Sequence, residues 1–174
     1  MTLLATNTPS GAATSDFTSG IDSTYKLYIF KWYDLNPVGD GAALQFQGNV
    51  AGQSGFNETI SSTTFRAYHT EADGTGLAYT DYDQAQGTGY QFISSNTGND
   101  NDQSSAGVLH LFNPSNTTYV KHFYARGHAN QSDDGAFTHF TSGYFNVTGA
   151  IDEISFKMNS GNIDSGTIKM YGVG

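Results

Sequence analysis

The sequence contains no cysteine and only three prolines, and it has few charged side chains. The absence of cysteine excludes disulfides, thiolate metal ligands and thiol nucleophiles, so the core must hold without covalent cross-links. No apolar run approaches the ~20 residues that a helix needs to cross a bilayer. The first residues, MTLLATNTPSG, lack the charged and apolar regions of a secretion signal. We therefore expect synthesis in the cytoplasm without a signal peptide.

Charge is scarce and unbalanced in sign. Charged residues make up 13% of the chain, which is about half of the usual share. The sequence contains seven Lys and Arg residues but 16 Asp and Glu residues, so the formal net charge is −9. Phosphate backbones and anionic lipid surfaces repel such a protein. We expect neither nucleic acid nor a membrane among its partners.

What the sequence does have is aromatic residues (14%) and glycine (21 of 174 residues). No stretch shows the 3.6-residue period of a helix, and about ten short strand-like runs alternate with turn signals. This pattern predicts an all-β fold with very little helix, a two-sheet antiparallel β-sandwich of jelly-roll type. We expect a single domain over 1–174 with a short N-terminal strand or arm at 1–16. A hairpin is predicted from two strand-like runs, Val108 to Phe112 and Thr118 to Arg126.

Residues Tyr25 to Leu35 predict a central strand, because Tyr, Leu, Ile, Phe and Trp favour pleated surfaces. Its odd and even positions are both apolar, which predicts that both faces are covered. We expect the Asn36-Pro37 step to end the strand, since proline donates no hydrogen bond. In Ala43 to Val50 apolar and polar residues alternate, which predicts one wet face. The polar run Ser95 to Ser105 predicts a surface loop.

Four segments together carry a resemblance to a known family. They are YKLYIFKWYDLNPVGDGAALQFQGN, FRAYHTEADGTGLAY, LHLFNPSNTTYVKHFYARG and IDEISFKMNSGNIDSGTIKMYGVG. Over essentially its whole length the chain resembles a family of structural proteins of tailed bacteriophages, notably of the marine cyanophage type. The resemblance implies a virion component with a jelly-roll or lectin-like sandwich, synthesised in the host cytoplasm. It implies no catalytic set and assigns no functional residues.

From this resemblance we expect a non-enzymatic capsid decoration or cement protein on the capsid exterior. Its partners are then the major capsid protein and copies of itself, in a homo-oligomer for which a trimer suits the lattice three-folds. The acidic charge fits a position outside a DNA-filled shell. The alternative is a tail-associated or fibre-tip protein with lectin-like recognition of a host surface glycan. The sequence shows no heptad or internal repeat of a fibre shaft.

Histidines are the first group of candidate functional residues. His122, His128 and His139 are candidates to meet at an interface as a proton-sensitive contact. The competing interpretation gives them packing and hydrogen-bonding roles within the sheet. No close ligand spacing such as H-x-x-x-H accompanies them, so a transition-metal site is not predicted.

Acidic loops are the second group. Asp100 and Asp102, with Asp133 and Asp134, offer oxygen ligands for a structural Ca²⁺ ion, the one cofactor that we consider. The loops lack the D-x-[DN]-x-[DN]-G frame and its terminal Glu, and the alternative is that they are simply solvated.

A third group combines aromatic rings with carboxylates, as sugar sites do. Trp32, Tyr33 and Asp34 form one half, and Asp81 to Asp83 form the other. The alternative is that these rings belong to the core or to an interface. Motifs for catalysis are missing: the sequence contains no G-x-S-x-G, H-E-x-x-H, Walker or Rossmann pattern. We therefore expect that the protein is not an enzyme.

Overall fold

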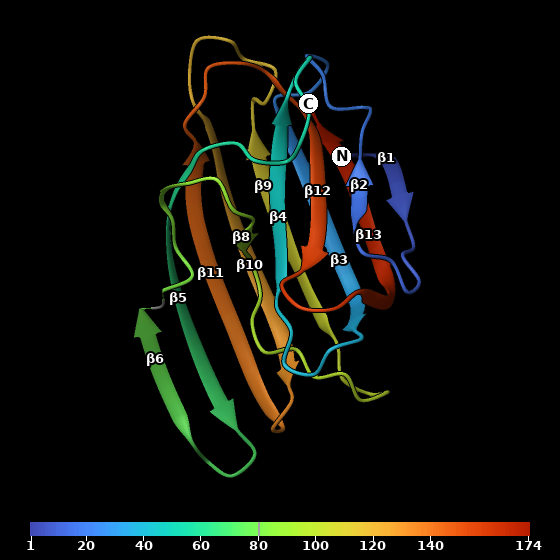
Figure 1. The fold of residues 1–174 in the computed structure, drawn as a ribbon, viewed down its shortest axis with the longest axis vertical. Coiled ribbons are helices and arrows are strands. Elements are labelled where there is room, and N and C mark those ends of the chain that lie inside the picture. Colours follow the sequence, from blue (N-terminus) through green and yellow to red (C-terminus); the bar gives the residue numbers. More distant parts are fainter. Residues whose placement is uncertain (80) are drawn as a thin grey trace.

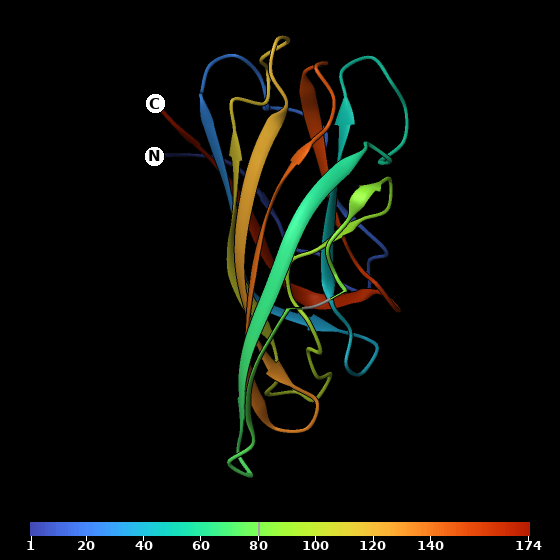
Figure 2. The ribbon, with the colours of Figure 1, turned by 90° about the vertical axis from the view of Figure 1, so that its left-hand side faces the viewer.

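The computed structural model describes residues 1–79 and 81–174. These residues form thirteen strands and no helix, so none of their segments is a helix that could span a membrane. Two antiparallel sheets pack face to face (Figures 1 and 2). The prediction of an all-β sandwich is confirmed, whereas the jelly-roll type stays a prediction.

The two sheets differ greatly in width. The nine-stranded large sheet has the order β1-β13-β3-β9-β10-β11-β5-β6, with β7 beside β5, and the small sheet has the order β2-β12-β4-β8. In Figure 1 the small sheet lies over only part of the large sheet, and β5, β6 and the lower ends of β10 and β11 extend beyond it. The strands of the large sheet are β1 (Thr2–Asn7), β13 (Ile163–Val173), β3 (Leu27–Pro37), β9 (Ser105–Phe112), β10 (Lys121–Gln131), β11 (Gly135–Phe145), β5 (Ile60–Thr70), β6 (Thr75–Tyr79) and β7 (Ala85–Gly87). The strands of the small sheet are β2 (Ser15–Phe17), β12 (Ile151–Met158), β4 (Leu44–Val50) and β8 (Gln91–Phe92).

Aromatic rings from both sheets interlock to form the core. Phe46 of β4 meets Phe123 of β10 edge to face at 5.0 Å, and Phe156 of β12 meets Phe30 of β3 at 5.5 Å. All four rings are buried. Such pairs add about 0.5–1.5 kcal/mol each beyond the area that they bury. The sandwich is therefore fixed across its layers by aromatic contacts.

Strand β3 is central, as predicted, and lies between β13 and β9. Two expectations about it are wrong. It does not end before the Asn36-Pro37 step, because a bulge around Asp34 (φ 52°) lets it continue until Pro37 pairs with Ile163. Only its inward face is fully buried, while the outward side chains are partly or fully exposed. The reason is that the described residues form no second layer over the outer side of the large sheet.

Strand β4 also differs from expectation, since it has no wet face. Gln45, Gln47 and Asn49 are 7%, 0% and 4% exposed. Gln47 Nε2 donates to the carbonyls of Glu58 at 3.0 Å and Gly89 at 2.9 Å, so connecting segments cover this face. The amide side chains satisfy backbone groups in the covering loops, which an apolar side chain would leave without partners.

The polar run that begins at Ser95 is only partly a surface loop. Ser95 and Thr97 are buried, and the segment lies over the inner face of β10. A Cβ atom at Gly127 would come within 2.2 Å of the Ile93 carbonyl oxygen, so this close approach requires glycine. The β9–β10 hairpin, in contrast, is confirmed.

A buried lysine hydrogen-bonds to three backbone carbonyls at one end of the sandwich. Lys121, at the start of β10, is fully buried, and its Nζ donates to the carbonyls of Tyr119 (2.7 Å), Val147 (3.2 Å) and Thr148 (3.1 Å). Burial lowers the pKa of Lys121 below its usual value. The ammonium thus ties the entry of β10 to the loop that follows β11.

Candidate functional site

The outer side of the large sheet exposes a regular array of side chains. In β10 buried and exposed residues alternate strictly, and the outward side chains include His122, Tyr124, Arg126 and His128. Figure 2 shows the two layers edge on, with no described strand lying over the outer side of the large sheet. We call the outward side chains of this sheet the outer face.

Aromatic rings line shallow hollows on the outer face. Phe65 stacks on Phe140 with ring centroids 4.8 Å apart, and Thr63, Ser142 and Tyr124 form the neighbouring row across the same three strands. A hollow of about 290 Å³ includes all five residues. A neighbouring hollow of about 510 Å³ shares Thr63, Tyr124 and Ser142 and continues to Phe112. We call the two together the aromatic groove.

Cations lie over aromatic rings at three places on the outer face. The geometry is that of cation–π contacts, in which the ring face attracts the positive charge. Tyr33 also raises the pKa of Lys169 through its hydroxyl. The pairs are Arg126 with Phe140 at 5.4 Å, Lys31 with Tyr171 at 5.6 Å and Lys169 with Tyr33 at 5.5 Å.

His110 extends the ring surface. It stacks on Tyr124 with centroids 4.3 Å apart and an interplanar angle of 17°. Partial burial, and secondly the ammonium of Lys31, lower the pKa of His110. The imidazole is therefore neutral at pH 7 and serves as a flat surface rather than as a charge.

The structure separates the residues of the predicted sugar site. Trp32 is 1% exposed and lies in the core, where it cannot present its ring to a ligand. Tyr33 and Asp34 are exposed at the bulge of β3. Tyr82 stacks on Phe92 at 4.5 Å, on the inner side of the large sheet. The aromatic and acidic residues that we grouped from the sequence therefore do not form one site.

The structure places the three candidate histidines on two different sides of the large sheet. His122 and His128 are exposed on the outer face, six positions apart along β10. His139 points to the inner side of β11 and is 2% exposed. His139 is thus too buried to take part in an interface, whereas a proton-sensitive contact of His122 or His128 at an interface stays a prediction.

The calcium candidates are exposed and loosely arranged. Asp100 and Asp102 lie in the loop before β9, and Asp133 and Asp134 in the β10–β11 turn. Gln103 joins the two loops through Nε2, which donates to the carbonyl of Gln131 at 3.2 Å. Within 1–79 and 81–174, no group of three His, Asp or Glu side chains is placed to hold a metal ion.

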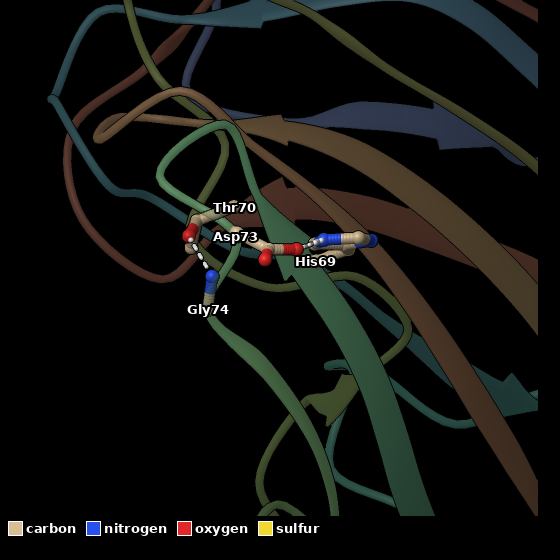
Figure 3. Close-up of polar contacts among 4 residues, drawn as sticks. All are labelled: His69, Thr70, Asp73 and Gly74. Carbon is tan, nitrogen blue, oxygen red and sulfur yellow. Dashed lines mark hydrogen bonds and ion pairs between the residues drawn. The ribbon is translucent and has the colours of Figure 1, made fainter.

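One histidine–carboxylate pair invites a catalytic interpretation. In the β5–β6 turn, His69 Nε2 lies 3.0 Å from Asp73 Oδ1, and Thr70 Oγ1 accepts a hydrogen bond from the Gly74 amide (Figure 3). Figure 3 shows the Thr70 hydroxyl turned towards Gly74 rather than towards the imidazole. The side chains of His69 and Asp73 are 59% and 95% exposed. We interpret the pair as a contact that stabilises the turn.

Sequence reasoning missed the residues of the aromatic groove. Phe65, Tyr124, Arg126 and Phe140 received no role, because aromatic residues occupy both sides of these strands and periodicity does not say which side is covered. The available signal was HFYARGHAN in β10, where large and small side chains alternate. No protein-family model and no curated protein matches the sequence.

Proposed function

We propose that the protein is a non-enzymatic structural component of a tailed-phage virion. In this proposal it is a decoration protein that binds the outer surface of the capsid lattice. It stabilises the lattice together with further copies of itself. A jelly-roll connection of its strands and a trimeric assembly are part of the same proposal.

The observation that carries the proposal is the nature of the two edges of the large sheet. The edge strand β6 presents Leu77 and Tyr79 at 75% and 68% exposure, and the opposite edge strand β1 presents Leu3 at 50%. Edge strands also carry unpaired backbone groups that are ready to pair with another chain. Exposed apolar side chains on both edges suit lateral contacts in an array.

The resemblance to phage structural proteins supports the proposal from a second side. Its segments coincide with the β3–β4, β5–β6, β9–β10 and β12–β13 units. These strands build the sandwich and its aromatic core, as a rigid structural part requires. The net charge of −9 suits the outer side of a shell filled with DNA.

Quantitative mass spectrometry of purified particles tests the proposal. Hundreds of copies per particle are expected for a capsid lattice position, and a handful would contradict it. Particles that lack the protein should rupture at lower temperature. Leu77→Lys and Leu3→Lys should weaken rebinding of the protein to such particles. Thr75→Lys is the control on the β6 edge: it adds the same charge but removes no apolar side chain, so it should weaken rebinding less.

A second candidate function is a tail-associated or fibre-tip role with recognition of a host glycan. The aromatic groove favours it, because rings and hydroxyl groups together suit a sugar. The copy number separates the two positions in the particle.

A further inference from the structure

Charge is distributed unevenly between the outer face and the rest of the molecule. The regularly paired outward positions of the large sheet hold none of the 16 acidic residues of the chain. They hold Lys31, Arg126 and Lys169, which belong to a total of only seven Lys and Arg residues. The paired outward positions of a protein with net charge −9 thus lack carboxylates. Asp34 and Asp164 lie at the end of β3 and β13, where they line a separate hollow with Asp102. The outer face attracts anions while the remaining surface repels them.

We propose that the aromatic groove and the cations beside it bind an acidic polysaccharide. The sugar rings lie against Phe65 and Tyr124, which are 45% and 44% exposed. The acidic groups of the polysaccharide pair with Arg126 and Lys31. This inference goes beyond the structural role in the particle, and it concerns the outer face wherever the protein is placed.

The register of the sheet puts charges and rings in one line. Lys31 pairs with Val108, Val108 with Arg126, Arg126 with Phe140, and Phe140 with Phe65. Neighbouring strands are about 4.8 Å apart, so Lys31 and Arg126 are separated by about 10 Å. Lys169 pairs with Lys31 at the far end of this line, so three cations and then two stacked rings lie in one row across the strands, with Val108 between Lys31 and Arg126. This arrangement suits a linear chain that carries charges at intervals.

The lining of the groove favours a sugar over other anions. A pyranose ring has an apolar C–H face and a rim of hydroxyls, and the groove offers rings beside the hydroxyls of Thr63 and Ser142. Arg126 supplies a planar guanidinium that pairs with a carboxylate through two hydrogen bonds. An acidic polysaccharide can therefore make stacking contacts with the rings and ion pairs with the cations along one line.

Nucleic acid and a second copy fit less well. A nucleic acid carries a negative charge on every nucleotide. The β5–β6 turn next to the outer face bears Glu71 and Asp73, whose carboxylates would repel these phosphates. Two copies packed by their outer faces would bring two surfaces that both carry Lys31, Arg126 and Lys169 together, and like charges across an interface are unfavourable. A polysaccharide with sparse acidic groups avoids both the repulsion of closely spaced phosphates and the repulsion between like cations.

Affinity electrophoresis of the full chain in gels containing polygalacturonate tests the proposal, with chondroitin sulfate as a sulfated probe and dextran as a neutral one. We expect retardation by polygalacturonate or chondroitin sulfate and none by dextran. Arg126→Gln should weaken the binding at least tenfold. Lys157→Gln is the matched control, because Lys157 lies over the ring of Tyr90 at 5.0 Å on the small sheet and its replacement changes the net charge equally.

A second variant separates sugar binding from simple charge attraction. Tyr124→Ser should weaken binding of polygalacturonate several-fold and leave any binding of poly-glutamate unchanged, since only a sugar uses the ring. Unaltered fluorescence of the buried Trp32 shows that each variant is folded.

The proposal is overturned if neither acidic polysaccharide retards the wild-type protein, or if Lys157→Gln weakens binding as much as Arg126→Gln. Tighter binding of oligothymidylate or poly-glutamate than of either polysaccharide also overturns it, and identifies nucleic acid or an acidic protein as the occupant. The copy number in particles is independent of these results, so this proposal and the structural role fail separately.

Discussion

His139 is a buried titratable group whose protonation should control stability in weak acid. It is 2% exposed, stacks on Tyr82 at 5.6 Å and pairs across the sheet with Arg66 of β5. Neither ring nitrogen hydrogen-bonds to any residue within 1–79 and 81–174. Burial first, and the charge of Arg66 second, lower the pKa of His139 to about 4. The folded protein therefore keeps this imidazole neutral.

The sign of the effect follows from proton binding. A histidine in the unfolded chain has a pKa of 6.5. Between that value and about 4, the unfolded chain binds a proton that the folded protein does not bind. The free energy of unfolding therefore decreases as the pH falls through this window, and the loss levels off below it. The difference between the two pKa values corresponds to about 3 kcal/mol, of which about 2 kcal/mol is lost by about pH 5.

Urea denaturation between about pH 7 and pH 4.5 measures this loss. Trp32 is the single tryptophan and is buried, so its fluorescence reports unfolding. Carboxylates also contribute to acid destabilisation, and the comparison with His139→Gln isolates the histidine. The variant should be about 2 kcal/mol less sensitive to the change from pH 7 to pH 5 than the wild type.

His128→Gln is the matched control, since it replaces an exposed histidine on the neighbouring strand β10. It should retain the pH dependence of the wild type. If His139→Gln and the wild type lose stability in parallel, the imidazole is not held neutral by burial and the reasoning is refuted.

Four further substitutions, one of them a control, are compared by urea denaturation. Trp32→Ala should lower the free energy of unfolding by about 3–5 kcal/mol because the side chain is buried, and a loss below about 1 kcal/mol would contradict its place in the core. Gly127→Ala should cost about 1–3 kcal/mol, since its Cβ would meet the Ile93 carbonyl oxygen, whereas Gly89→Ala, with no atom within 4 Å of the added Cβ, should be nearly neutral. Equal effects of the two glycine variants would argue against the close approach. Lys121→Met should cost about 1–3 kcal/mol because three carbonyls lose their donor, and an unchanged stability would show that those carbonyls find other partners.

Several features of the fold were predictable because they depend on local chemistry. The aromatic and aliphatic residues of β3 marked a central strand, and two strand-like runs close together in the sequence marked the β9–β10 hairpin. In β12, Ile154, Phe156 and Met158 follow a two-residue period and are all buried. In each case a property of neighbouring residues determines the outcome.

Predictions failed where distant segments decide the environment. Gln47 is polar and was expected on a solvent-exposed face of its strand, yet loops from elsewhere in the chain bury it. Trp32 and Tyr33 are adjacent in sequence but lie on opposite sides of β3. Phe65 and Phe140 meet only because β5 pairs with β11.

By itself, the sequence determined that the protein is built of strands joined by tight turns, because composition and two-residue periodicity act locally. It also determined an acidic molecule without disulfides or thiol chemistry. Only the tertiary structure decided which side of each strand is covered, since a strand with rings on both sides has two equivalent faces until a second sheet packs on one of them. The four-stranded small sheet covers the inner side, and the rings and cations of the outer face remain accessible to a ligand.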